Sequence, residues 1–196
     1  MIKRVILLIL LLGLSLFSCT ENEKKEGESK ENIILLNDEL VIDENLNISY
    51  QVPLNWDKMP ASLSKKYVAR LNSKNKNEFV LYFPKSFFYD KNSSALLRVG
   101  KVTLKEGSST SKLTPQKYVE LFERFNTNLK INQEQIVSDN LEMIKLIIEK
   151  GKLLSFKIIF YNWQKEIIQL DFSIKKEDAS KLKSAIDAAI KSIKLL

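Results

Sequence analysis

The chain contains no histidine and a single cysteine, and these absences remove much of catalytic chemistry. Without histidine there is no Ser-His-Asp triad, no imidazole general base and no histidine-bearing zinc site. Glycine and proline are also scarce, with five and four residues among 196, while 44% of the residues are hydrophobic. These proportions are typical of an ordinary globular chain, so one folded domain is expected.

The familiar catalytic motifs are missing as well. There is no Gly-rich phosphate loop and no Gly-x-Ser-x-Gly elbow. Ser62-Leu-Ser-Lys65 contains Ser-x-x-Lys, but it lies on a predicted helix without the other penicillin-site motifs, so we interpret it as coincidence. The acid pairs Asp38-Glu39 and Asp43-Glu44 could attract a cation, although solvation explains them more simply. We therefore expect no catalytic residue, metal site or cofactor.

Residues 1–18 have the features of a bacterial export signal. Lys3 and Arg4 precede an apolar run that is too short for the roughly 20 residues of a membrane-spanning helix. The run ends in Leu-Phe-Ser-Cys19, which resembles the lipobox, where the signal peptide is removed and the cysteine receives lipid. The alternative is an ordinary signal peptide with an incidental cysteine. We favour lipidation because Cys19 is the chain's only cysteine.

Lipid on Cys19, including a palmitate-type acyl chain, would anchor the protein to a bacterial cell membrane, facing the periplasm or exterior. The mature chain would then have neither a free thiol nor a disulfide. Residues 20–44 contain nine acids and three lysines, and we expect 19–44 to be the lipidated cysteine and an acidic tether. Residues 45–196 form the predicted domain.

This domain is basic, with 26 bases and 15 acids from residue 45 onward. Only Arg70, Arg98 and Arg124 of these bases are arginine. Proteins that recognise phosphates and nucleotide bases favour arginine, because its guanidinium group makes bidentate hydrogen bonds. The lysine-rich composition therefore argues against a nucleic-acid partner. Contact with a membrane surface stays open as a second interpretation of the charge.

Hydrophobic periodicity predicts a mixed order of strands and helices. We expect helices over 61–72, 114–129 and 177–195, and strands over 45–53, 78–83, 95–105, 131–150 (one or two strands), 154–160 and 168–174. The apolar face of the 95–105 strand changes phase at Gly100, which suggests a β-bulge. The last two strands alternate cleanly around a turn, so this hairpin is expected to bury one face.

The element order resembles that of the PsbP-like family. The matching segments are Tyr50-Gln-Val-Pro-Leu-Asn-Trp56 at the front, and 156–172 with 185–194 at the back. The resemblance implies an α+β fold with a central antiparallel sheet flanked by helices, in an α/β/α sandwich. It also implies binding rather than catalysis, and it identifies the chain as similar to the family's bacterial exported lipoproteins.

Aromatic residues supply the candidate partner-binding positions. Phe87, Phe88 and Tyr89 belong to an aromatic run over 83–89 that no single strand face can bury. Such a cluster forms either core plus a covered loop or an exposed patch for a partner. Trp163 lies in the turn of the predicted hairpin, where it either folds back over the sheet edge or stands out as an anchor.

The sequence therefore favours a lipid-anchored, extracytoplasmic binding or assembly factor without catalytic activity. Its partners would be the membrane, through Cys19, and an unidentified protein or envelope ligand. The alternative is a hydrolase of cell-envelope polymers that uses two carboxylates. Such carboxylates are placed by the fold rather than by sequence spacing, so only a structure can locate them.

We predict that Cys19 is the first residue of the mature chain and carries lipid. Replacing Cys19→Ser removes the sulfur to which lipid attaches, so the protein should leave the detergent phase in phase partitioning. Intact-mass spectrometry of the native protein should show the acylated mass, and an unmodified Cys19 would contradict the prediction.

Overall fold

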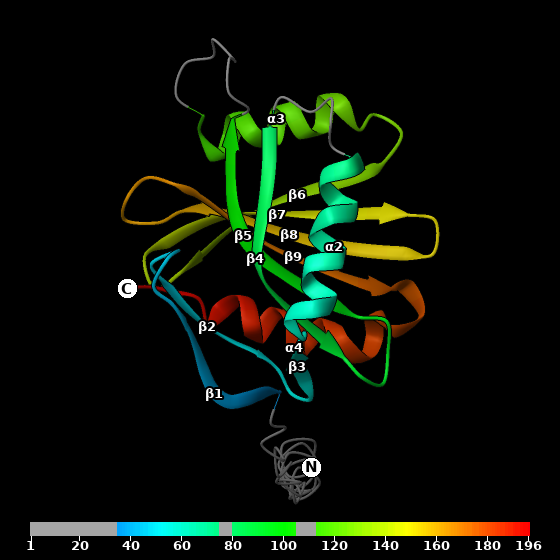
Figure 1. Cartoon of the computed structure of the whole chain (residues 1–196). Coiled ribbons are helices and arrows are strands. Elements are labelled where there is room, and N and C mark those ends of the chain that lie inside the picture. Colours follow the sequence, from blue (N-terminus) through cyan, green and yellow to red (C-terminus); the bar gives the residue numbers. More distant parts are fainter. Residues whose placement is uncertain (1–34, 75–79, 105–112) are drawn as a thin grey trace, which may run out of the picture. The chain divides into compact units, whose positions relative to one another are not determined.

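Seven antiparallel strands form the main sheet, in the order β3-β4-β5-β9-β8-β7-β6 (Figure 1). They are β3 (Trp56–Lys58), β4 (Val80–Asp90), β5 (Leu96–Leu104), β6 (Lys130–Ser138), β7 (Leu141–Lys150), β8 (Leu153–Tyr161) and β9 (Ile167–Lys175). The structure is a computed structural model and describes residues 35–74, 80–104 and 113–196. The predicted signal peptide, Cys19 and most of the predicted tether lie outside these ranges.

A second, three-stranded sheet has the order β1-β2-β10. It consists of β1 (Leu36–Asp43), β2 (Ile48–Pro53) and β10 (Lys194–Leu195), with both neighbours antiparallel to β2. The folded part therefore begins before residue 45, where we expected the tether to end. The acidic composition of β1 suggested a tether, but backbone pairing with β2 holds this strand and does not require apolar side chains.

The larger hydrophobic core lies between one face of the main sheet, strand β2 and helix α4 (Ala179–Lys191). Helix α4 follows a short 3-10 helix, η1 (Lys176–Asp178), and buries the predicted apolar face, which includes Ala185, Ile186, Ala189 and Ile190. The helix ends earlier than predicted, because Ile193 and β10 turn back to pair with β2. The C-terminal residues thus join the second sheet instead of extending the helix.

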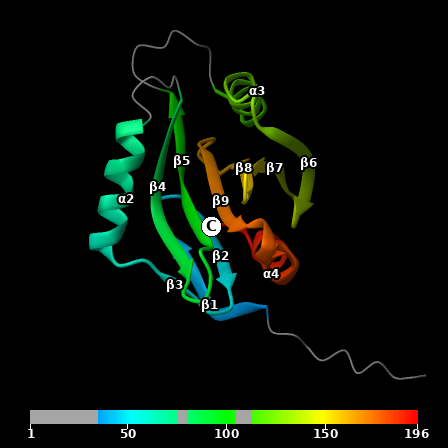
Figure 2. The same ribbon diagram turned by 90° about the vertical axis from the view of Figure 1, so that its right-hand side faces the viewer.

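The opposite face of the main sheet carries α2 (Ala61–Lys74) and α3 (Pro115–Phe125). Figure 2 shows α2 and α4 on opposite sides of strands β4, β5 and β9. The predicted start of α3 is confirmed, since the Thr114 hydroxyl accepts a hydrogen bond of 3.1 Å from the Lys117 backbone N–H and Pro115 follows the cap. Phe125 at the end of α3 is 62% exposed, because the buried part of this helix is centred on Tyr118 and Val119.

The expected bulge at Gly100 belongs to the neighbouring strand. Strand β5 pairs with β9 without a shift, whereas the register with β4 shifts between Pro84 and Ser86. The phase change in β5 has another cause, because Leu97 and Val99 join the core under α4 while Val102 joins the core under α3. Gly100 is still required, since a Cβ there would collide with the Phe83 carbonyl oxygen of the bulged strand.

The prediction of one-sided burial in the β8–β9 hairpin is wrong. Gln169 and Asp171, on the polar face of β9, are each 1% exposed. The Asp171 carboxylate receives hydrogen bonds from Arg98 of β5 (2.5 Å) and Lys157 of β8 (2.7 Å). Burial lowers the pKa of Arg98, but the Asp171 carboxylate together with Tyr82 and Tyr67 outweighs this effect, so the pKa is raised. Both cations pair with the same Asp171 oxygen, and an alternating pattern in the sequence does not reveal this buried pairing.

We predict that Asp171→Asn destabilises the protein strongly, because it leaves Arg98 and Lys157 mostly buried without their carboxylate. Breaking a buried ion pair from one side costs about 3–5 kcal/mol, so the free energy of unfolding in urea should fall by that order. Glu177→Gln is the control, since it removes an exposed pair with Lys175 and should cost under about 1 kcal/mol. Equal effects of the two substitutions would contradict the prediction.

Candidate binding site

The aromatic run 83–89 does not form an exposed patch, because strand β4 buries aromatic rings on both faces. Phe87 and Phe88 are 3% and 4% exposed, and Tyr89 is half-buried. Phe87 contacts the Tyr67 ring of α2 at a centroid distance of 5.7 Å, while Phe88 meets Tyr50 of β2 at 6.1 Å. The structure therefore places Phe87 and Phe88 in the core, away from any partner.

Trp163 is different, since it stands out from the turn between β8 and β9. Its side chain is 68% exposed, whereas the chain's other tryptophan, Trp56, is 2% exposed. The interpretation that Trp163 folds back over the sheet edge is therefore wrong. Leaving an indole in water forgoes the stabilisation of a few kcal/mol that burial of a large apolar side chain provides.

Backbone hydrogen bonds hold the turn that presents Trp163. The Asn162 N–H donates to the Glu166 carbonyl (3.1 Å), and the Lys165 N–H donates to the Asn162 carbonyl (3.0 Å). Lys165 has a φ of 59°, the left-handed conformation that closes the turn. The tip containing Trp163 is thus closed by main-chain bonds on both sides.

Side chains then fasten this turn to the rest of the protein. Asn162 is 2% exposed; its amide NH₂ donates to the Leu46 carbonyl (3.0 Å), and its carbonyl oxygen accepts from the Glu166 N–H (2.9 Å). The Lys101 ammonium of β5 donates to the Glu166 carboxylate at 2.6 Å. This hydrogen bond lowers the pKa of Glu166 below its ordinary value of 4.5. Trp163 is therefore an exposed side chain on a fixed base.

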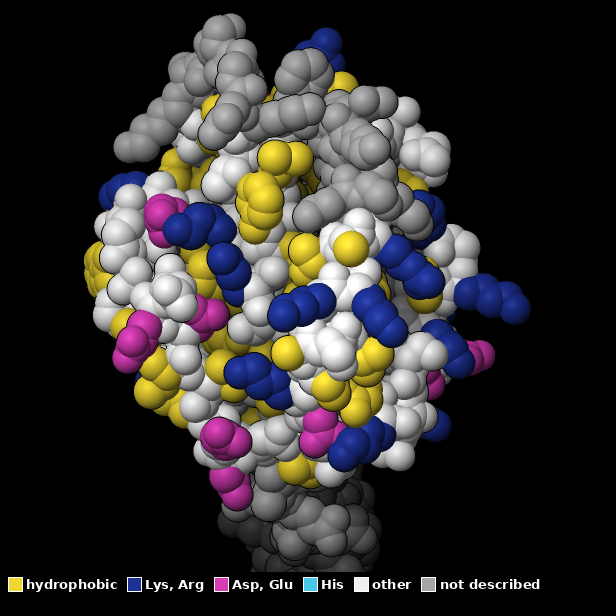
Figure 3. All heavy atoms as spheres, viewed as in Figure 1, with side chains coloured by type: hydrophobic (Ala, Val, Ile, Leu, Met, Phe, Trp, Pro, Cys, Tyr) yellow, Lys and Arg dark blue, Asp and Glu magenta, His cyan; other side chains and the backbone are white. Residues whose placement is uncertain are grey.

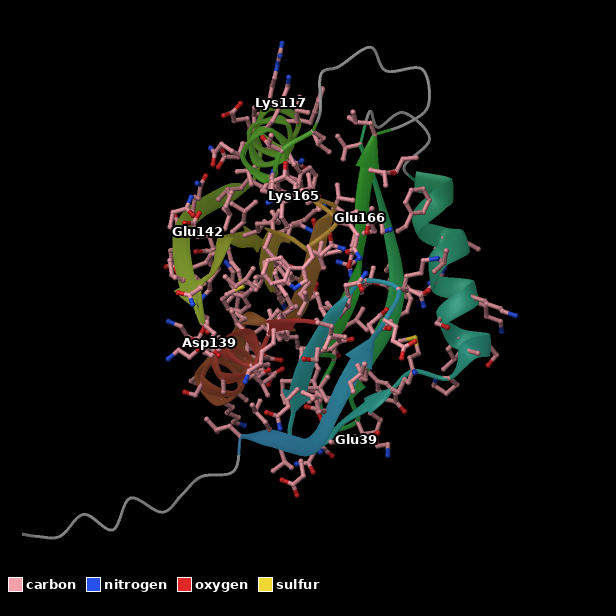
Figure 4. The ribbon with its side chains drawn as sticks, turned by 90° about the vertical axis from the view of Figure 1, so that its left-hand side faces the viewer. Glu39, Lys117, Asp139, Glu142, Lys165 and Glu166 are labelled. Atoms are coloured by element: carbon pink, nitrogen blue, oxygen red, sulfur yellow. The ribbon has the colours of Figure 1, made fainter. Side chains whose placement is uncertain are left out.

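A groove of about 460 Å³ lies beside Trp163. Four parts of the chain line it: the start of α3, the end of β6 with the start of β7, the end of β8 with its turn, and Leu195 of β10. Figure 4 shows Glu142 and Lys165 entering this region from different elements, with Lys117 of α3 above them. Its volume is within the 300–1,000 Å³ typical of ligand sites.

The groove has an apolar interior and a polar rim. Buried Leu141, Met143, Ile144 and Ile159 belong to the interior. Tyr161 is half-buried, and its hydroxyl donates a hydrogen bond to the Leu113 carbonyl at 3.2 Å. The Lys165 ammonium lies 5.9 Å from the centre of the Tyr161 ring. Glu142 is the single carboxylate among the lining residues and Lys165 the single base, so the lining is close to neutral.

The surface around α2 has a different character. Figure 3 shows lysine and arginine side chains spread over the face that carries α2, and α2 itself contains Lys65, Lys66, Arg70 and no acid. This face is therefore basic (Figure 3), whereas the groove lining is close to neutral. The neutral groove and the basic face are separate surfaces.

The acid pair that includes Asp43 has a structural role. The Asp43 carboxylate accepts a hydrogen bond from the Leu46 N–H (3.2 Å) and so closes the β1–β2 turn. Across the described ranges, no three histidine, cysteine or acidic side chains gather as metal ligands. The helices described by the structure include none with the length and apolar character to cross a membrane.

Sequence reasoning located Trp163 but missed the groove. The lining residues come from separate stretches around 114–116, 135–144 and 159–165 and from Leu195, which no local motif connects. The one available signal was a tryptophan among polar residues in a turn, and that signal does not tell which way the ring points.

Comparison with known proteins identifies similar folds. No family model and no curated protein matches the chain. The solution structure of PsbP from the cyanobacterium Synechocystis shares 13% identity over 85% of this chain and 96% of its own, with a TM-score of 0.50. LpqN of Mycobacterium tuberculosis, involved in cell envelope biogenesis, shares 13% identity over 82% and 91%, with a TM-score of 0.48. The Ran-binding protein Mog1p of Saccharomyces cerevisiae shares 10% over 82% and 96%, with a TM-score of 0.43.

The similarity to cyanobacterial PsbP confirms the resemblance inferred from the sequence at the level of the fold. The chain has a PsbP-like fold: α+β, with antiparallel sheets and three helices in the described residues. Because a fold does not determine function, the ligand has to be argued from the groove and the Trp163 turn.

We predict that the Lys101–Glu166 bond makes part of the stability pH-dependent. A lowered pKa in the folded state means that ionised Glu166 stabilises the fold above the ordinary pKa of 4.5, and that this contribution is lost as pH falls through the lowered value. Between neutral pH and about pH 3, the melting temperature should therefore fall more for the wild type than for Glu166→Gln.

At neutral pH, the free energy of unfolding of the wild type should exceed that of Glu166→Gln by about 1 kcal/mol or less. The effect is small because Glu166 is partly exposed and water screens the ion pair. Glu142→Gln is the matched control, since it removes a nearby exposed carboxylate that does not hold the turn. Parallel melting curves for the wild type and Glu166→Gln at every pH would rule out this role for Glu166.

Proposed function

We propose that this chain is a lipid-anchored, extracytoplasmic binding or assembly factor that acts without catalysis. The lipobox-like sequence ending at Cys19 supports attachment to a bacterial cell membrane, with the domain facing the periplasm or exterior. The PsbP-like domain then presents the groove and Trp163 to a protein or ligand of the cell envelope.

The observation that carries this proposal is the exposure of Trp163 on a fixed turn. An exposed indole contributes little to folding, yet six hydrogen bonds made by Asn162, Lys165, Glu166 and Lys101 hold its base. Their partners lie in β5, in the β8–β9 turn and in the β1–β2 loop. Tryptophan is enriched among the residues that dominate binding energy. A preorganised side chain also loses less conformational entropy when it binds.

The chemistry of the groove supports binding over hydrolysis. A carboxylate-dependent hydrolase needs two acids near the scissile bond, about 5–10 Å apart. Glu142 is the one acid among the groove residues, and its neighbours in the lining are amides, apolar side chains and Lys165. Within the described part of the chain, the groove thus offers contacts to a ligand but no second carboxylate for such a mechanism.

A photocrosslinking experiment in cells tests the proposal with the full chain. A photoreactive amino acid at Gln164, which is exposed beside Trp163, should give a discrete adduct. Trp163→Ala should greatly reduce this adduct, since loss of a central aromatic anchor costs about 2 kcal/mol or more, roughly thirty-fold in affinity. The melting temperature should stay within about 2 °C, because the exposed ring supports little of the fold.

The same photoreactive group at exposed Lys183 of α4 is the control and should not give this adduct. An adduct at Gln164 that is equally abundant with and without Trp163 would contradict the proposal. A large drop in melting temperature for Trp163→Ala would also contradict it, because the ring would then serve the fold.

A further inference from the structure

Three amide side chains stand around the groove without a partner. Gln116 of α3, Gln135 of β6 and Asn140 of the β6–β7 turn are all exposed, and none hydrogen-bonds to another group in the described part of the chain. Each amide can donate and accept hydrogen bonds at once. Gln116 comes from a different element than Gln135 and Asn140, so the fold brings these amides to one groove.

The charge of the groove selects for an uncharged ligand. Residues from 45 onward carry an excess of bases, yet the described residues that line the groove include only Lys165 and Glu142 as charged groups. A site for phosphates or acidic polymers would concentrate several bases to complement the ligand. A ligand with neutral hydroxyl and amide groups fits this lining better.

Aromatic rings complete the arrangement. The exposed face of Trp163 lies at the rim and Tyr161, fixed by its bond to the Leu113 carbonyl, lies beside it. A sugar ring has an apolar C–H face, which an aromatic ring covers, and a circumference of hydroxyl groups, each of which donates and accepts. The aromatic rings of the groove would cover the C–H face of a sugar, and the amides would hydrogen-bond to its hydroxyl groups.

We propose that the groove binds a neutral segment of an envelope glycan, with a sugar ring stacked on Trp163 and its hydroxyl or acetamido groups bonded to Gln135, Gln116 and Asn140. This inference rests on the proposed binding function and names its ligand class. A protein partner would use the same surface, and the test below distinguishes it from a glycan.

The test measures binding of two neutral probes to the purified full-length protein in detergent: the tetramer of β-1,4-linked N-acetylglucosamine, and cellotetraose. The chain has two tryptophans, and buried Trp56 serves as an internal reference. Bound sugar should shift the fluorescence of Trp163 to shorter wavelength in a saturable way. The wild-type shift should disappear in Trp163→Ala, and calorimetry should show at least a tenfold weaker binding.

Gln135→Ala should weaken binding about tenfold. Gln133→Ala is the matched control, because Gln133 is an exposed amide of the same strand outside the groove lining, and it should bind like the wild type. Tighter binding of the N-acetylated probe would show that the groove amides hydrogen-bond to acetamido groups. Equal binding of both probes would show that they hydrogen-bond to hydroxyls. Both results support a neutral glycan.

Absence of saturable binding of either probe overturns the glycan assignment, as does equal binding by Gln135→Ala and the wild type. The proposed binding function is judged separately by the Trp163-dependent adduct. If that adduct forms on a protein while neither sugar binds, the groove is a protein-binding site and only the glycan inference fails.

Discussion

The buried carboxylate of Asp171 is the interaction on which the main sheet depends. Asp171 lies on β9, at the centre of the seven strands, and one of its oxygens receives the cations of Arg98 from β5 and Lys157 from β8. The three strands are neighbours, so this single charge links both sides of β9 in one register. A shift by one residue would move Asp171 to the opposite face, into the hydrophobic core beneath α4.

The same three strands also determine the position of the candidate binding site. The turn between β8 and β9 carries Trp163, and Lys101 of β5 reaches across to Glu166 at the start of β9. Asn162 ties the turn to the β1–β2 loop through the Leu46 carbonyl. The exposed ring is thus an extension of the rigid sheet, which explains how a loop residue can present a fixed surface to a ligand.

Much of the local structure could be predicted, because it follows from short-range periodicity and caps. The start of helix α3 at Thr114, helix α4 itself and the pairing of β8 with β9 were all confirmed. Strand β1 was missed because its acidic residues resemble a solvated tether, although backbone bonds to β2 hold it. The bulge was assigned to the wrong strand because Gly100 records the close approach of its neighbour rather than an irregularity of its own.

The sequence by itself determined the three helices and most of the longer strands, since side-chain periodicity and capping act within a few residues. It also placed Trp163 in a turn. Only the tertiary structure decided that Gln169 and Asp171 are buried, that Phe87 and Phe88 belong to the core, and that Trp163 faces water beside a groove. These outcomes depend on which elements cover each face of the sheet, and that covering comes from contacts between residues far apart in the chain.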